Sequence, residues 1–217
     1  MISFLIPIKD QAILDFHQVQ TQTHSCLSVS GSEVHIGLSS DNYGHAKAIL
    51  DLFKHDRKRV KVHVTDDKGL YDGWNKLVAL AGTDYVCFLG LGDLVICPKY
   101  FETLKMGSGV NAFFSRVAIT TERRQRIFGR KFNRRFHQFR QHSAFVGAVF
   151  SVELFGYQQF DTRFRIAGDY EWLLRASPSF ISSFEPVISV WMPAGGMSEA
   201  LLDETKSEVA RAKKSNR

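Results

Sequence analysis

Residues 67–93 place a polar turn, a helix and a buried strand in immediate succession, and this order constrains the fold more than any other feature. Apolar residues recur at helical spacing through residues 70–80, which predicts an amphipathic helix. Residues 85–89 are a short, continuously apolar run and predict a buried strand. Gly90, Leu91 and Gly92 then form a glycine-rich turn, and Asp93 stands just past the carboxyl end of that strand. In an open α/β sheet, ligands bind just past the carboxyl ends of the strands.

The same alternation runs through the first half of the chain. Strands are expected at residues 2–8, 33–37 and 60–64, and helices at 12–22 and 46–54. This order predicts an α/β fold with a mainly parallel sheet and right-handed crossovers. Further on, we expect a short helix at 100–106, a strand at 110–119, a basic hairpin or loop at 123–131, a helix starting at Asp169, a β region at 180–192 and a terminal helix at 198–214.

Composition indicates a folded domain without a membrane span. The 217 residues are 44% hydrophobic and include 18 Phe, enough for a sizeable core. No apolar run approaches the ~20 residues of a membrane span, and the first ten residues lack the basic start and cleavage site of a signal peptide. Cys26, Cys87 and Cys97 lack metal-ligand spacing and suggest free thiols. We therefore expect a cytoplasmic protein.

The net charge of +6 is concentrated in residues 123–140, here called the basic segment. The segment holds no acid and eight cationic residues: Arg123, Arg124, Arg126, Arg130, Lys131, Arg134, Arg135 and Arg140. Of the 28 basic residues, the 20 outside it face 22 acids, so the rest of the chain is slightly acidic. This distribution indicates a local anionic partner. Phe128, Phe132, Phe136 and Phe139 recur at intervals near four, which favours an amphipathic helix that packs its Phe face on the core or on a bilayer surface.

Several spaced residues match one known pattern at once. In the first half they are Ser3, Ile6, Pro7, the turn 37–42, Asp67, Lys68, Gly69, Tyr71, Asp72, Asn75, Lys76, Phe88 and Leu89. In the last third they lie in residues 142–145, 153–156, 160–161, 164–175 and 195–198. On these residues the chain resembles the family 2 glycosyltransferases, inverting enzymes with the GT-A fold. The resemblance implies one three-layer α/β/α domain, with residues 1–95 as the nucleotide-sugar-binding half and 96–217 as the acceptor half.

The resemblance also implies a reaction and a set of site residues. A sugar would pass from a nucleotide-sugar donor to a glycan or lipid-linked acceptor, in the assembly of a bacterial surface polysaccharide or lipid-linked glycan. Asp169 would be the catalytic base that takes the proton of the acceptor hydroxyl, and Asp93 would hold a divalent metal, Mn²⁺ or Mg²⁺, that neutralises the leaving diphosphate. Substrate contacts are implied for Pro7, Asp41, Lys68, Asp72, His142 and Arg175.

Most of these residues also have a plain structural interpretation. Asp93 follows a strand, where aspartate commonly forms a turn, and Asp169 could cap a helix. Asp72 stands on the polar face of the helix at 70–80, where a side chain is usually solvated. His142 could be a satisfied structural histidine, and Arg175 could pair with an acid.

Two departures from the family pattern keep a second function open. Ile36 stands where the family has the aspartate that reads the nucleobase, and Gly92 replaces the first carboxylate of the usual pair. Both would suit a non-catalytic GT-A domain that acts as a glycan-binding, nucleotide-binding or partner subunit. A nucleotidyltransferase would need a Gly-rich, basic loop after the first strand, and residues 9–11 (Lys-Asp-Gln) do not provide one.

The basic segment admits several partners. It could close over the donor's pyrophosphate, bind a phosphate-bearing acceptor such as a lipid-linked sugar, or rest on anionic lipid at the inner face of the membrane. It could equally be a solvated face. Its aromatic residues match no nucleic-acid-binding module, so we do not expect a nucleic-acid partner.

Overall fold

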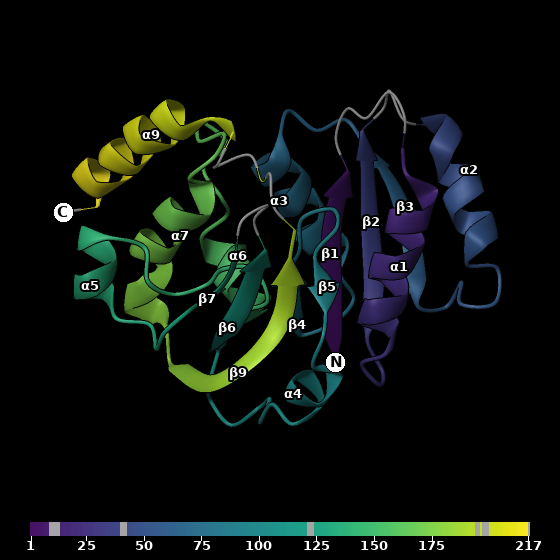
Figure 1. Ribbon diagram of the computed structural model, residues 1–217, viewed down its shortest axis with the longest axis horizontal. Coiled ribbons are helices and arrows are strands. Elements are labelled where there is room, and N and C mark those ends of the chain that lie inside the picture. Colours follow the sequence, from purple (N-terminus) through teal and green to yellow (C-terminus); the bar gives the residue numbers. More distant parts are fainter. Residues whose placement is uncertain (9–13, 40–42, 121–123, 194–195, 197–199, 217) are drawn as a thin grey trace.

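The structure, a computed structural model, describes residues 1–8, 14–39, 43–120, 124–193, 196 and 200–216. The first half alternates strands and helices as the sequence predicts. Its elements are β1 (Ile2–Ile8), α1 (Phe16–Leu27), β2 (Glu33–Ser39), α2 (Tyr43–Leu52), β3 (Val60–Thr65), α3 (Leu70–Leu80) and β4 (Tyr85–Phe88). The four strands are parallel, in the order β3-β2-β1-β4 (Figure 1). Helix α1 starts later than expected because Asp15 caps it, accepting the N–H groups of His17 and Gln18.

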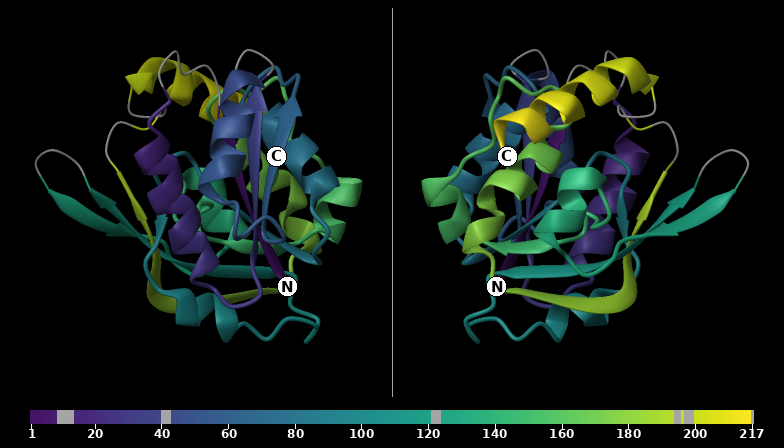
Figure 2. Two further views of the ribbon diagram at one scale, coloured as in Figure 1. Left: turned by 90° about the vertical axis from the view of Figure 1, so that its right-hand side faces the viewer. Right: turned by 90° about the vertical axis from the view of Figure 1, so that its left-hand side faces the viewer.

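The second half extends this sheet with strands of mixed direction. Its elements are β5 (Leu94–Val95), α4 (Pro98–Glu102), β6 (Ala112–Thr120), β7 (Gln125–Phe128), α5 (Arg134–Phe139), β8 (Val149–Ser151), α6 (Glu153–Tyr157), α7 (Gly168–Ala176), the 3₁₀ turn η2 (Ser177–Ser179), β9 (Ser182–Met192) and α9 (Leu202–Ser215). Strand β8 lies antiparallel beside β4, and β6, β9 and β5 follow in that order. Strand β7 pairs with β6, and this hairpin projects from the body of the molecule (Figure 2).

Helices cover both faces of the sheet, which confirms the α/β/α layering. Along β1, Phe4 and Ile6 face one apolar cluster and Leu5 faces the other. Helices α1, α2 and α4 supply the first cluster, whereas α3, α6 and α7 supply the second. The α/β fold expected from the sequence is therefore confirmed.

An aromatic cluster joins the two halves of the chain on the α3 face. Its rings are Trp74, Phe88, Phe145, Phe150, Phe155, Phe160 and Trp172. Phe155 and Trp172 stack with their centroids 4.5 Å apart, and Trp172 is fully buried. Aromatic pairs of this kind add ~0.5–1.5 kcal/mol each beyond the area they bury, so the cluster stabilises the packing of α6 and α7 against β4.

The basic segment contributes β7, which forms a hairpin with β6, and the short helix α5. The hairpin expected within residues 123–131 is therefore present, whereas the expectation of one amphipathic helix through the four Phe is wrong. Phe128 lies in β7, and Phe132 stacks on Phe114 of β6 at 5.3 Å. Gly129 separates them with φ +117°, and a Cβ there would lie 2.5 Å from Ser115 O. The backbone must therefore bend close against β6 at this point, which no helix can do. Helical structure resumes only at α5, whose six residues Asn133 caps.

Helix α9 packs on α7 and has 14 residues, the most of any described helix. No helix in the described ranges is long and apolar enough to cross a bilayer.

The first residue of α7, Gly168, has no room for a side chain. A Cβ there would lie 2.7 Å from the Tyr71 ring, so we expect Gly168→Ala to lower the free energy of unfolding by about 1–3 kcal/mol. The matched control is Gly156→Ala in α6, where nothing lies within 4 Å of the added Cβ. The control should be neutral or gain up to about 1 kcal/mol, since alanine favours helix. Urea denaturation of both variants measures the difference, and equal stabilities would contradict the close packing of Tyr71 on α7.

Candidate active site

Strands β1 to β4 end at one edge of the sheet (Figure 1). Several predicted site residues belong to the ends of these strands or follow them directly. Pro7, near the end of β1, is half-buried beneath α3, and a Cβ on Gly73 would lie 3.2 Å from Pro7 Cβ. Thr65 ends β3 and donates its hydroxyl to Asp67 Oδ2 at 3.1 Å. Residues 90–93 follow β4 at the same edge. Asp41 lies outside the described residues, so its predicted substrate contact stays a prediction.

Asp169 is the second residue of α7 and is held from the other half of the chain. The Tyr71 hydroxyl donates to Ile166 O at 2.6 Å and lies 3.2 Å from Asp169 Oδ1. Burial raises the pKa of Asp169 above its usual value, although hydrogen bonds from the Tyr170 backbone N–H and the Gln141 side chain favour the carboxylate. The carboxyl is thus oriented by neighbours and holds a proton more readily than an ordinary aspartate.

The Glu208 carboxylate, which the sequence did not indicate, holds the residues that lead into α7. Glu208 of α9 accepts the backbone N–H groups of Arg165, Ile166 and Ala167 at 2.8, 2.9 and 2.8 Å. Burial alone would raise the pKa of Glu208, but these three N–H groups outweigh it and hold the pKa below its usual value. Nothing in the sequence around residue 208 indicates this role, because the partners lie some forty residues away.

Asp169 opens onto a cavity of about 390 Å³ between α7, α9 and the β6–β7 hairpin. Two exposed cations of the basic segment, Arg124 and Arg126, lie on the hairpin side of this cavity. Its apolar lining comes mainly from Val117, Ile119, Phe128, Ala144, Val146, Ile166, Met192 and Val209. The described lining of the cavity therefore combines the Asp169 carboxyl group, the guanidinium groups of Arg124 and Arg126, and apolar walls.

Asp93 closes the turn after β4. Its Oδ2 accepts the Gly90 N–H at 2.7 Å, and the residue is only 5% exposed. Gln22 of α1 holds the same turn from outside, donating to Gly90 O at 2.7 Å and accepting the Gly92 N–H at 3.0 Å. Gly92 has φ +94°, and a Cβ there would lie 2.7 Å from Gln18 Nε2. The left-handed φ thus favours glycine at the position where the resembled family has a carboxylate.

The described residues supply one carboxylate for a divalent metal and no complete ligand set. No group of three His, Cys, Asp or Glu in the described ranges could hold a metal ion. Asp93 offers Oδ1, because its Oδ2 accepts from Gly90. Mg²⁺-type ions are commonly held by one or two carboxylates, with substrate phosphates and water as further ligands. A metal beside Asp93 would therefore need further ligands from outside the described residues, such as substrate phosphates and water.

Asp72 and the Lys68 backbone are hydrogen-bonded to each other at the start of α3. Asp72 Oδ2 accepts the Lys68 N–H at 2.8 Å and the Lys76 ammonium at 3.0 Å. Burial would raise the pKa of Asp72, but these two donors hold it below its usual value. The carboxylate therefore holds the turn that leads into α3, while the Lys68 side chain is exposed.

His142 and Arg175 have protein partners away from the cavity. His142 Nε2 accepts the Asn133 N–H at 3.1 Å, and its ring lies over Phe132. Burial, the largest cause, lowers the pKa of His142, which favours the neutral ring. Arg175 binds the buried Glu171 through two nitrogens, at 2.7 and 3.0 Å. For both residues these contacts favour a structural role over the implied substrate contact.

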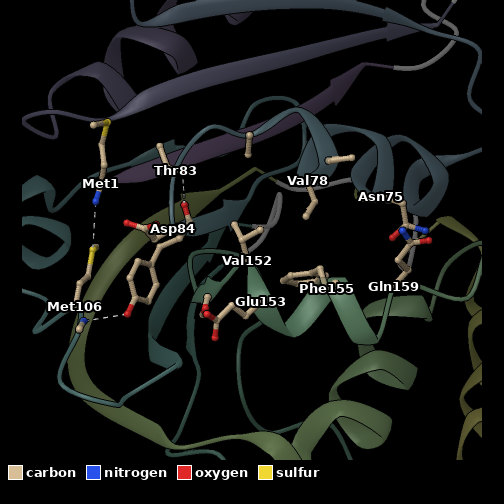
Figure 3. Close-up of a pocket in the computed structure, with 16 residues that line it drawn as sticks. Met1, Asn75, Val78, Thr83, Asp84, Met106, Val152, Glu153, Phe155 and Gln159 are labelled. Carbon is tan, nitrogen blue, oxygen red and sulfur yellow. Dashed lines mark hydrogen bonds between the residues drawn. The ribbon is translucent and has the colours of Figure 1, made fainter.

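A groove larger than the Asp169 cavity lies at the opposite edge of the sheet (Figure 3). It has a volume of about 790 Å³ and lies between the start of β4, α3 and α6, with Met1, Asp84 and Glu153 among its lining residues. Size alone would make this groove the candidate site. The smaller cavity is favoured because it holds Asp169 and lies toward the carboxyl ends of the parallel strands.

The buried Asp93 predicts a pH dependence of stability. Burial raises the pKa of Asp93 from 3.8 to about 7, so the folded protein binds a proton that the unfolded chain has already released. The free energy of unfolding should then fall as the pH rises from about 4 to about 7, by up to about 4 kcal/mol. In Asp93→Asn this loss should disappear, whereas Asp169 keeps its own contribution in both proteins. Urea denaturation at pH 5 and pH 8 measures the slope, with Asp84→Asn as an exposed control; equal slopes in wild type and Asp93→Asn would contradict the burial.

Comparisons with known proteins find their matches among solved structures. No protein-family model matches the chain. No curated protein matches it in sequence. S. aureus TarS 1–349 in complex with UDP-GlcNAc superposes with a TM-score of 0.68 at 12% identity, over 97% of this chain and 66% of that one. Mannosyltransferase PcManGT from Pyrobaculum calidifontis, in complex with GDP-Man and Mn²⁺, gives 0.68 at 12% identity, over 97% and 62%.

A third similar structure is glucosyl-3-phosphoglycerate synthase from Mycobacterium tuberculosis, with Mn²⁺, UDP and glucosyl-3-phosphoglycerate. It superposes with a TM-score of 0.65 at 12% identity, over 98% of this chain and 79% of that one. The chain spans 39% of the longer TarS structure and about two thirds of TarS 1–349. At such low identity the likeness concerns the fold alone, which is the GT-A fold.

Proposed function

We propose that this chain is an inverting glycosyltransferase that moves a sugar from a nucleotide-sugar donor to a glycan or lipid-linked acceptor, with Asp169 as the general base. The observation that carries the proposal is the Asp169 carboxyl, held by Tyr71 and opening onto the cavity. Support also comes from the fold, which this chain shares with structures that contain UDP-GlcNAc or GDP-Man.

In the proposed reaction one bond forms as another breaks. The acceptor oxygen attacks the anomeric carbon of the donor sugar, and the bond from that carbon to the diphosphate breaks on the opposite side. The proton of the acceptor hydroxyl passes to Asp169, and the nucleoside diphosphate leaves. A pKa raised by burial suits this step, because proton transfer is most effective when the pKa of the base approaches the working pH.

The donor would lie along the ends of β1 to β4. Pro7 and the Asp67–Lys68 turn would border the nucleotide, and Asp72 would keep that turn in shape through its bond to the Lys68 N–H. Asp93 would contribute one carboxylate oxygen to a divalent metal, Mn²⁺ or Mg²⁺. Such a metal, when bound, neutralises the charge of the leaving diphosphate.

The acceptor would enter the Asp169 cavity from the side of the β6–β7 hairpin. Arg124 and Arg126 bring two positive charges to that side, which favours a phosphate-bearing acceptor. The apolar walls suit the carbon face of a sugar ring. His142 and Arg175, which the resemblance assigned to substrate, would act indirectly by supporting the basic segment and α7.

Two observations favour a non-catalytic GT-A domain as the second candidate. Ile36 is fully buried within β2, so it cannot make the contact of a base-reading aspartate. Asp93 is almost fully buried and already bonded to its own turn. A domain of this kind would bind a nucleotide or glycan without transferring the sugar.

The test measures the nucleoside diphosphate released from UDP- and GDP-sugars when the sugar passes to water or to an added acceptor. This assay tests the proposal whichever acceptor the enzyme uses. Asp169→Asn should lower the release rate by about 10²–10⁴-fold with donor affinity nearly unchanged, because only proton transfer is lost. Asp93→Asn should lose metal-dependent donor binding. Asp84→Asn, an exposed carboxylate at the opposite edge, is the matched control and should match wild type.

Equal loss of donor binding in Asp169→Asn and Asp93→Asn would contradict the division of roles. Donor binding by wild type without any sugar transfer or release would favour the non-catalytic domain instead.

A further inference from the structure

Helix α5 carries two phenylalanines on the outside of the molecule. Phe136 is 66% exposed and Phe139 is 77% exposed. Three positions separate them, so they share one face of the helix. Side chains of this size are normally buried in a folded protein, and two of them side by side mark a surface that a partner covers.

The helix cannot turn these rings inward, because its other side is fixed to α7. His137 is fully buried and stacks on Tyr170, with the ring centroids 4.6 Å apart. The Tyr170 hydroxyl donates to His137 O at 2.5 Å, and Asn133 caps the helix by accepting the Phe136 N–H. Phe136 and Phe139 are therefore presented outward on a rigid support.

Positive charge surrounds this pair. Exposed cations of the basic segment flank α5: Arg130, Lys131, Arg134, Arg135 and Arg140. The end of α9 lies beside α5 (Figure 1), where Arg134 donates to Asn216 O and Lys213 donates to Phe139 O. Lys214 adds a further exposed cation there. Glu171, a carboxylate near this surface, is buried and paired with Arg175, so it does not offset this charge.

We propose that α5 and the end of α9 form a docking surface for an anionic lipid bilayer, with Phe136 and Phe139 inserted among the headgroups. The surface is here called the α5 face. Aromatic rings beside cations suit the interface between headgroups and acyl chains, which needs no preformed groove. Lipid phosphates supply the complementary charge. A protein partner would instead need a pocket for two rings beside a matching acidic surface.

The α5 face lies next to the proposed catalytic carboxyl. Tyr170, which binds α5, follows Asp169 directly, and Gln141, just past α5, hydrogen-bonds Asp169. A bilayer on this face would present lipid-linked acceptors close to the Asp169 cavity. This last step rests on the proposed function, whereas the docking itself does not.

Co-sedimentation of the full chain with vesicles tests the docking surface. Vesicles of phosphatidylcholine with 30% phosphatidylglycerol should bind the protein, and pure phosphatidylcholine should bind it at least about tenfold more weakly, with binding to the anionic vesicles weakened by salt. Phe136→Ser with Phe139→Ser should lower vesicle affinity at least about tenfold. Arg135→Gln with Arg140→Gln should lower it about fivefold for each charge removed.

Matched controls separate this surface from general stickiness and net charge. Tyr157→Ser removes a 91% exposed aromatic ring from α6, and Lys99→Gln with Lys105→Gln removes two exposed cations elsewhere. All control variants should bind vesicles as wild type does. Circular dichroism spectra and thermal midpoints like those of wild type show that the Phe variant is folded.

Absence of binding to anionic vesicles at low salt would overturn the inference, as would equal losses in the test and control variants. Self-association that disappears in the Phe variant, without vesicle binding, would assign the α5 face to a second copy of the chain. Vesicle binding without nucleotide-sugar turnover would contradict the proposed function and leave the docking surface standing. Nucleotide-sugar turnover without vesicle binding would contradict the docking surface and leave the proposed function standing.

Discussion

The contact between Tyr71 and the start of α7 fixes the relation between the two halves of the chain. The Tyr71 hydroxyl binds Ile166 O at 2.6 Å and lies beside the Asp169 carboxyl, while Gly168 leaves space for the ring. Burial and the nearby Asp169 charge raise the pKa of Tyr71, which keeps its hydroxyl protonated as a donor. Because Tyr71 belongs to the parallel half and Asp169 to the mixed half, this contact decides where the carboxyl opens relative to the ends of β1 to β4. Glu208 supports the same segment from outside.

Local pattern was enough to predict the parallel half. Short apolar runs separated by amphipathic stretches define β1 to β4 and α1 to α3, and parallel pairing follows from that order. The position of Asp169 at the start of α7 could also be predicted, since the residues that follow it have helical periodicity. The ion pair of Arg175 with Glu171 follows the four-residue spacing of helix neighbours and was open to prediction as well.

Contacts between distant residues account for what the sequence did not reveal. The turn 90–93 is shaped by Gln18 and Gln22, some seventy residues earlier, so the burial of Asp93 and the need for glycine at position 92 could not be foreseen. The Phe spacing of the basic segment suggested a helix, but Gly129 bends the chain against β6 and divides the segment. Because the segment is divided in this way, Phe136 and Phe139 face solvent while Phe132 packs on Phe114.

The account depends most on a nucleotide diphosphate site at the ends of the parallel strands, with Asp93 beside the diphosphate. A thermal-shift screen of nucleoside diphosphates, each with and without Mn²⁺, tests this site directly. One nucleotide should raise the melting temperature only when Mn²⁺ is present, and at a hundred times its Kd it should add about 2.7 kcal/mol to the free energy of unfolding. Absence of any shift, at concentrations that saturate a known transferase, would contradict the donor site and with it the proposed sugar transfer.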